Sequence, residues 1–245
     1  MVNRWIGLVM VGLLCAGGPV SDAQALESAG AADGLKEALR VGIRTAVEKV
    51  GQEDGFLKNP DIRIPLPSVL QKIEPVMKTA GAGEMLENLK VKMNRAAEKA
   101  APEALDIFVG AIKDLKIEDA MGLLKGGETA ATDYLREKTS DDLQEAFHPT
   151  VKETMADVNA VQTYQSIMDQ YGGAISKTAG QLGALAKATG MGDIGETDLD
   201  VNAYVTEKAI DGLFVMVGRE EAKIRENPAA RATDILKSVF GSLTQ

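Results

Sequence analysis

The sequence has very few of the residues that carry most catalytic chemistry. It contains one cysteine, Cys15, and one histidine, His148, in 245 residues. Zinc sites need several His or Cys ligands, and a Ser-His-Asp triad needs a nucleophile motif that this sequence lacks. We therefore predict no metal site, no thiol chemistry and no cofactor. His148 is expected to hydrogen-bond at a helix end.

Positive charge and aromatic residues are also scarce. The net charge is -9, and aromatic residues make up 4% of the chain. Nucleic acids and anionic membrane surfaces are bound through cationic patches, so we predict no nucleic-acid partner. With so few aromatic rings, we expect Leu, Val, Ile, Ala and the ten Met residues to pack the core.

One long apolar run lies near the start of the chain. It spans Trp5–Leu14, follows the basic Arg4 and precedes the small-x-small sequence Ala23–Ala25. This arrangement is typical of a secretory signal peptide, and the run is shorter than the about 20 residues that cross a bilayer. We predict that residues 1–25 are cleaved off, which leaves a periplasmic or secreted chain with no transmembrane span.

The position of Cys15 allows a second interpretation, in which it becomes the acylated first residue of a lipoprotein. Lipoprotein signals usually place a bulky aliphatic residue three positions before the cysteine and a small residue directly before it. Gly12 and Leu14 reverse that order. Cleavage after Ala25 is therefore the preferred prediction, and lipid anchorage through Cys15 is its alternative.

The rest of the chain has apolar residues at helical spacing, and no window alternates with a period of two. We predict an all-α protein, with a flexible N-terminal segment over residues 26–34 and a single helical domain over 35–245. A bundle of roughly eight to ten helices fits this length. The expected helices are 35–50, 68–78, 84–101, 102–115, 117–124, 130–138, 141–147, a stretch after His148-Pro149, 161–171, a weak helix within 174–195, 201–226 (capped by Asp198) and a last one reaching Phe240.

Three polar residues stand out on the helix expected over 84–101. Asn94, Arg95 and Glu98 lie among alanines, beside the apolar stripe of this helix. Polar groups in that position are partly buried and need partners. We interpret them either as a structural network that sets the helix register or as a ligand site.

The connector between residues 51 and 67 is the second unusual segment. Its three prolines forbid a long helix, and long ordered loops often carry function. Its polar candidates are Asp54, Asn59 and Arg63. The alternative is a loop that only connects and is held by Phe56 and the prolines.

These same segments resemble a bacterial family known as domain of unknown function 4197. The resemblance spans about Leu35 to Gly241 and implies an exported or envelope-associated helical domain with no assigned activity. No catalytic or binding residue can be carried over from the family. The matching stretches are Gly51–Phe56, Ile64–Pro67, Met93–Glu98 running to Ala101-Pro102, Gly126-Gly127, Ala130–Tyr134, Asp211–Phe214, Glu221, Ile224-Arg225, Asn227-Pro228 and Arg231.

The leading hypothesis is a non-enzymatic periplasmic helical protein that binds an envelope protein or a small apolar ligand. A bundle rich in Met and Ala can open a groove between its helices. One alternative is a carboxylate-based cell-envelope hydrolase that uses Glu98 or Asp54. Another is a purely structural envelope protein. The arrangement of Asn94, Arg95, Glu98, Asp54 and Arg63 distinguishes these hypotheses.

Overall fold

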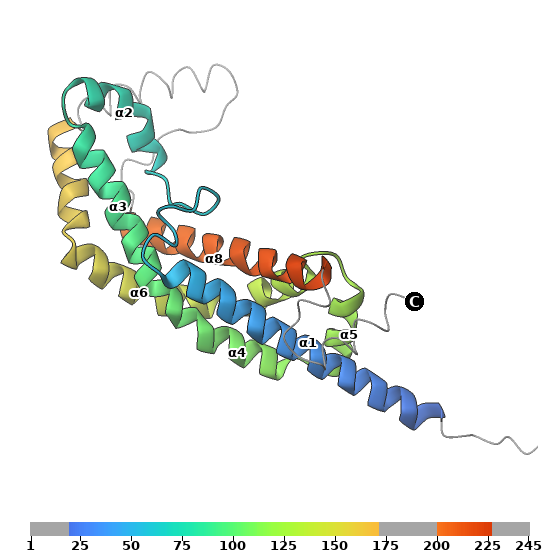
Figure 1. Ribbon diagram of the computed structural model, residues 1–245. Helices are drawn as coiled ribbons and strands as arrows, with labels where there is room; N and C mark the ends of the chain where they lie inside the picture. The colour runs from blue at the N-terminus through green and yellow to red at the C-terminus, as the bar shows by residue number, and fades with distance from the viewer. Residues whose placement is uncertain (1–19, 172–199, 227–245) are drawn as a thin grey trace, which may run out of the picture.

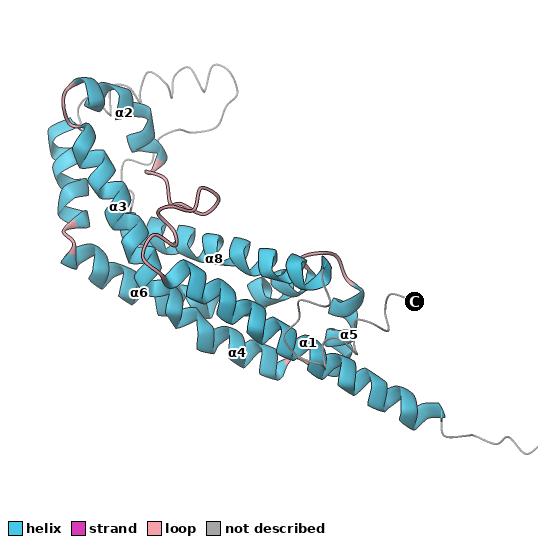
Figure 2. Ribbon diagram, in the orientation of Figure 1, coloured by secondary structure: helices cyan, strands magenta, loops and turns pink. Residues whose placement is uncertain are grey.

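The computed structural model describes residues 20–171 and 200–226 of the chain (Figure 1). Within these residues every regular element is helical and there is no strand, which confirms the predicted all-α class (Figure 2). Residues 160–171 are also helical. The remaining elements are α1 (Val20–Gly51), α2 (Ser68–Thr79), α3 (Gly83–Ala100), the short 3-10 helix η1 (Ala101–Glu103), α4 (Ala104–Asp114), α5 (Ile117–Lys125), α6 (Ala130–Asp157) and α8 (Val201–Glu226).

Helix α8 packs against α1, α3 and α6. Helix α4 packs on α1 and α6, and α5 closes the far end against α1 (Figure 1). The core between these helices contains four fully buried phenylalanines, and Phe108 meets Phe214 edge to face with ring centroids 5.6 Å apart. Most other core positions are Leu, Ile, Val, Ala or Met, as the composition indicated.

Helix α1 begins earlier than the periodicity indicated. It starts at Val20, so residues 26–34, expected to be a flexible segment, are helical. Ala32 and Leu35 are both buried, which fixes this part of the helix against the body of the protein. The predicted cleavage point after Ala25 lies within this helix. Cys15 lies outside the described residues.

Helix α6 is one continuous element where several short helices were expected. The hydroxyls of Thr139 and Ser140 donate to the carbonyls four residues earlier, at 2.7 and 2.6 Å, and do not begin a new helix. Pro149 lies inside the helix, flanked by the buried Phe147 and Val151. Their burial in the core outweighs the hydrogen bond that proline removes.

The N-terminus of α8 is capped by Asp200. Its Oδ1 accepts hydrogen bonds from the backbone N–H groups of Asn202 and Ala203, at 2.8 and 3.2 Å. Asp198, the predicted cap, lies outside the described residues, as do the segment 174–195 and the last expected helix. The other described helices, α2 to α5, begin and end within a few residues of their predicted positions.

Candidate functional site

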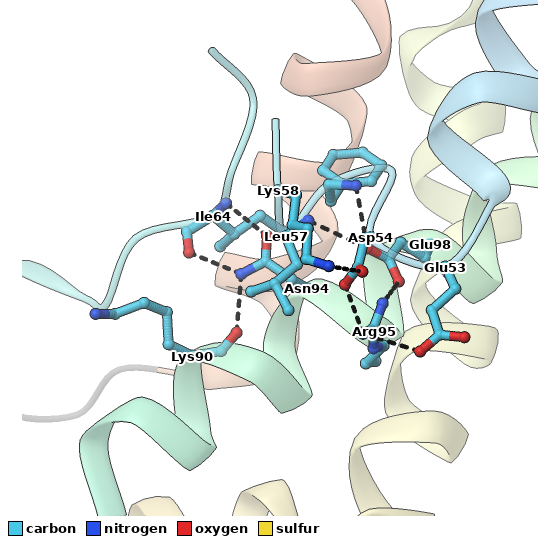
Figure 3. Close-up of polar contacts among 10 residues, drawn as sticks. Glu53, Asp54, Leu57, Lys58, Ile64, Lys90, Asn94, Arg95 and Glu98 are labelled. Carbon is cyan, nitrogen blue, oxygen red and sulfur yellow. Dashed lines mark hydrogen bonds and ion pairs between the residues drawn. The ribbon is translucent and has the colours of Figure 1, made fainter. Parts of the chain in front are cut away.

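Asn94 projects from α3 toward the connector that joins α1 to α2. Its Oδ1 accepts a hydrogen bond from the N–H of Ile64 at 2.8 Å (Figure 3). Its Nδ2 donates to the Ile64 carbonyl at 3.0 Å and to the Lys90 carbonyl at 2.8 Å. The side chain is fully buried. Asn94 therefore pairs with the Ile64 backbone much as a neighbouring strand would, and this satisfies main-chain groups that would otherwise be buried without partners.

Glu98 lies one turn further along α3 and is 4% exposed. Its Oε1 accepts hydrogen bonds from two successive backbone N–H groups, those of Phe56 and Leu57, both at 3.1 Å (Figure 3). Its Oε2 accepts from Arg95 Nη1 at 2.6 Å. Both carboxylate oxygens are thus engaged, and the burial of the negative charge is compensated by a cation and two dipoles.

Arg95 extends this network toward the solvent. Its Nη2 lies 2.7 Å from Asp54 Oδ1 and 3.3 Å from Glu53 Oε1. Asp54 Oδ2 in turn lies 2.7 Å from Lys58 Nζ. Asp54 has a φ of 67°, a left-handed conformation that Asp tolerates better than most residues. The cluster therefore runs from a buried carboxylate to a partly exposed chain of alternating charges.

The pKa of Asp54 is lowered from its ordinary value of 3.8, because Lys58 and Arg95 both hydrogen-bond to its carboxylate. The stabilisation from these pairs is therefore complete above the ordinary pKa and is lost as the pH falls through the lowered one.

We expect Lys58→Met to raise the Asp54 pKa toward 3.8, as measured by NMR titration of its carboxyl carbon. Lys125→Met, on α5, is the control, and an unchanged Asp54 pKa in Lys58→Met would contradict the prediction.

Two of the six candidate residues lie apart from this cluster. Asn59 contacts α8, where its Nδ2 lies 3.5 Å from the Sδ of Met216, and its Oδ1 accepts from the Asp61 N–H. Arg63 is exposed, and its side chain takes no part in the network around Arg95. The other four residues lie together: Asn94 and Glu98 bind the backbone of the connector, and Arg95 pairs with the Glu98 and Asp54 side chains. Glu53 and Lys58 complete the cluster. The position of Glu53 directly before Asp54, at the start of the connector, is the sequence feature that could have indicated Glu53.

The connector is also fixed against α8 by a close approach at Gly212. A Cβ atom added there would lie 2.7 Å from Phe56 Cε1 and 3.1 Å from Ile62 Cβ. Only glycine leaves room for the Phe56 ring at this position. The connector is therefore held on two sides, by polar contacts from α3 and by close packing against α8.

A second buried carboxylate holds backbone in the same way. Glu221 on α8 accepts from the N–H groups of Ala131 and Thr132 at the start of α6, at 3.0 and 2.7 Å, and from the Thr132 hydroxyl at 2.7 Å. Arg225 Nη2 pairs with Glu221 Oε1 at 2.7 Å and donates to the Leu123 carbonyl at the end of α5. In the sequence, Glu221, Thr132 and Arg225 stand out only as parts of the stretches that resemble the family. Arg225 follows Glu221 by one helical turn, whereas Thr132 is 89 residues away and nothing local indicates that contact.

The adjacent Glu220 faces another helix and has different partners. Its Oε1 lies 2.7 Å from Lys49 Nζ on α1 and 3.0 Å from Lys223 Nζ. Burial acts to raise the pKa of Glu220, but hydrogen bonds from the two lysines outweigh burial, and the net shift is downward. The two neighbouring acids therefore bind different elements and do not form a catalytic dyad.

A groove of about 420 Å³ lies between α4 and α6, apart from both networks. Burial raises the pKa of the Tyr134 phenol in this groove, and the nearby Asp119 carboxylate adds to the effect. Lys138 Nζ lies 5.8 Å from the centroid of the Tyr134 ring. The groove is lined by Asp106, Ile107, Gly110, Ala111, Asp114, Tyr134, Lys138, Thr139 and Asp142.

The described residues offer no site for a metal and no membrane span. No group of three or more His, Cys, Asp or Glu side chains among them is arranged to hold a metal ion. In the same part of the chain, no helix combines the length and apolar character needed to cross a bilayer.

One known protein family matches most of the chain. The family described as protein of unknown function (DUF4197) matches residues 25–241. The chain belongs to this family. No curated protein and no solved structure matched the DUF4197 chain.

The segments through which the DUF4197 chain resembles its family supply much of both networks. Asp54, Asn94 and Glu98 belong to the first network, and Thr132 and Glu221 belong to the second. In this chain, these segments therefore hold the connector against α3 and the start of α6 against α8.

Proposed function

We propose that this DUF4197 protein is a non-enzymatic periplasmic helical protein that binds a protein partner. The observation that carries the proposal is the engagement of Glu98, the buried carboxylate that sequence reasoning offered as a catalytic group. Both of its oxygens bind groups of the chain itself. A general acid or base must reach a proton of its substrate, and Glu98 is committed to the connector instead.

Asp54 supports the same conclusion for the exposed side of the cluster. Its two oxygens pair with Arg95 and Lys58, and these cations hold the pKa of the carboxyl below its ordinary value. A carboxyl with a lowered pKa is a poor proton donor near neutral pH, whereas a glycosidase needs one carboxyl whose pKa is raised. The cluster therefore favours a structural role over cell-wall hydrolysis.

The groove between α4 and α6 favours a protein partner over a small apolar ligand. Pockets for apolar ligands are lined mainly by apolar and aromatic side chains, with few polar groups. This groove carries the charged residues Asp106, Asp114, Lys138 and Asp142, and it is open to solvent. Charged, open surfaces are typical of the polar parts of protein interfaces.

The proposal is tested in living cells with a photo-crosslinking residue placed singly at Lys113, Gly122 or Val215. All three positions are exposed, and they lie on α4, α5 and α8. We expect the mature chain to begin at Leu26 and to be found in the periplasmic fraction after cell fractionation. We also expect the crosslinker to form a discrete adduct with one protein from some of the three positions but not from all. Mass spectrometry identifies both the first residue and the adduct.

Three outcomes would contradict the proposal. The first is retention of the chain in the cytoplasm, and the second is the same weak adducts from all three positions. The third is release of peptidoglycan fragments by the purified protein, lost in Glu98→Gln while the fold is kept, which would favour a hydrolase.

A further inference from the structure

The α4 wall of the groove is shaped by residues four positions apart. Asp106, Gly110 and Asp114 lie on one face of the helix, and the eight helical steps from Asp106 to Asp114 span about 12 Å. A Cβ atom added at Gly110 would have no other atom within 4 Å. The wall therefore has an open notch at its centre and a carboxylate at each end.

The α6 wall repeats this spacing with different chemistry. Tyr134, Lys138 and Asp142 are also four positions apart. The Lys138 ammonium lies over the Tyr134 ring, as cations do over aromatic faces, and it pairs with Glu137 at 2.9 Å. The chain thus already places an alkylammonium group on this ring.

The carboxylates of the groove are available to an incoming cation. Asp106, Asp114 and Asp142 are exposed, and none of them forms an ion pair within the described part of the chain. Lys138 is the one cation in the lining. The excess of negative charge agrees in sign with the net charge of -9, so the groove is complementary to a basic ligand.

The spacing of the two carboxylates on the α4 wall fits an extended chain. An extended segment advances about 3.3 Å per residue, so residues four positions apart are separated by about 13 Å. This separation matches that of the Asp106 and Asp114 positions.

We propose that this groove binds an extended segment of the partner protein that carries two Lys or Arg residues about four positions apart. This inference rests on the proposed partner-binding function and names the chemistry of the partner. The two basic side chains meet Asp106 and Asp114, and Asp142 faces them from α6. The backbone of the segment passes over the notch at Gly110.

The test uses the full mature chain and a fluorescent peptide in which two lysines are separated by three Val or Thr residues. Fluorescence anisotropy measures binding. We expect Gly110→Leu, which fills the notch, to weaken binding about tenfold or more. Gly122→Leu is the matched control, because Gly122 is also an exposed helical glycine with nothing within 4 Å of an added Cβ. Both substitutions replace glycine with a better helix former, so both variants are expected to fold.

A second pair of variants tests charge. The double variant Asp106→Asn, Asp142→Asn is expected to weaken binding and to flatten its salt dependence. The control Glu84→Gln, Asp169→Asn makes the same change in net charge at exposed positions outside the groove and is expected to bind as the unmodified protein does. A third arm replaces the peptide with spermidine.

The outcomes separate this inference from the proposed function. Equal weakening by both charge variants, no effect of Gly110→Leu, or spermidine binding as tight as peptide binding would overturn the groove as a peptide site. If a discrete adduct then forms only from Gly122 or Val215, partner binding stands and this groove is not its surface. An adduct from Lys113, which is next to Asp114 of the groove, together with loss of peptide binding in Gly110→Leu, supports both.

Discussion

Replacing Glu98 with alanine is expected to lower the free energy of unfolding by about 3–5 kcal/mol. The substitution removes the acceptor of the Phe56 and Leu57 N–H groups and leaves the Arg95 guanidinium without its nearest carboxylate. Buried main-chain donors without partners cost free energy, and a partly buried charge adds to that cost. The effect is large because one side chain satisfies three groups.

Chemical denaturation of the mature chain measures this loss, and amide hydrogen exchange locates it. In Glu98→Ala, we expect exchange to accelerate most at Phe56 and Leu57. Glu98→Gln keeps a carbonyl oxygen for these two N–H groups and is expected to lose less stability than Glu98→Ala. Glu84→Ala, at an exposed position on the same helix, is the control and is expected to change stability by less than about 0.5 kcal/mol. A loss below about 1 kcal/mol in Glu98→Ala would contradict the proposed structural role.

Replacing Glu221 with alanine is expected to have a comparable effect, also about 3–5 kcal/mol. Glu221 is 4% exposed and accepts from two N–H groups and a hydroxyl at the first turn of α6. Its removal also leaves Arg225, which reaches the last carbonyls of α5, without its carboxylate. The junction of α5, α6 and α8 therefore loses its central contact.

The same two measurements test this second prediction. Amide exchange in Glu221→Ala is expected to accelerate first at Ala131 and Thr132, and to remain slow at Phe56 and Leu57. The two alanine variants are thus controls for each other, because their networks share no residue. Accelerated exchange at the same amides in both variants would indicate global destabilisation and would contradict a local role for each carboxylate.

Several helices could be predicted from periodicity and chain-breaking residues. The end of α1 at Gly51, the irregular connector and the limits of α3 and α5 follow from local sequence. Helix α6 could not be predicted as one element, because Thr139, Ser140 and Pro149 are typical of helix boundaries. The buried neighbours of Pro149, and the hydroxyls that bond back along the helix, overrode those local preferences.

The candidate site was predicted in part. Asn94, Arg95 and Glu98 were recognisable because polar residues beside an apolar stripe must find partners. The connector was identified by its prolines, but nothing local indicated that Asp54 joins the cluster while Asn59 contacts α8 and Arg63 faces solvent. The direction of each loop side chain depends on the path of the backbone, which the packing of Phe56 against Gly212 determines.

By itself, the sequence determined the helical class, the family and the fact that residues 26–245 contain one histidine and no cysteine. These are properties of composition and of patterns repeated within a few residues. Tertiary structure alone decided that Glu98 holds the backbone at Phe56 and that Glu221 holds the start of α6, across separations of 42 and 90 residues. Such contacts depend on how the helices pack, and short-range periodicity carries no information about which distant backbone groups a buried carboxylate will meet.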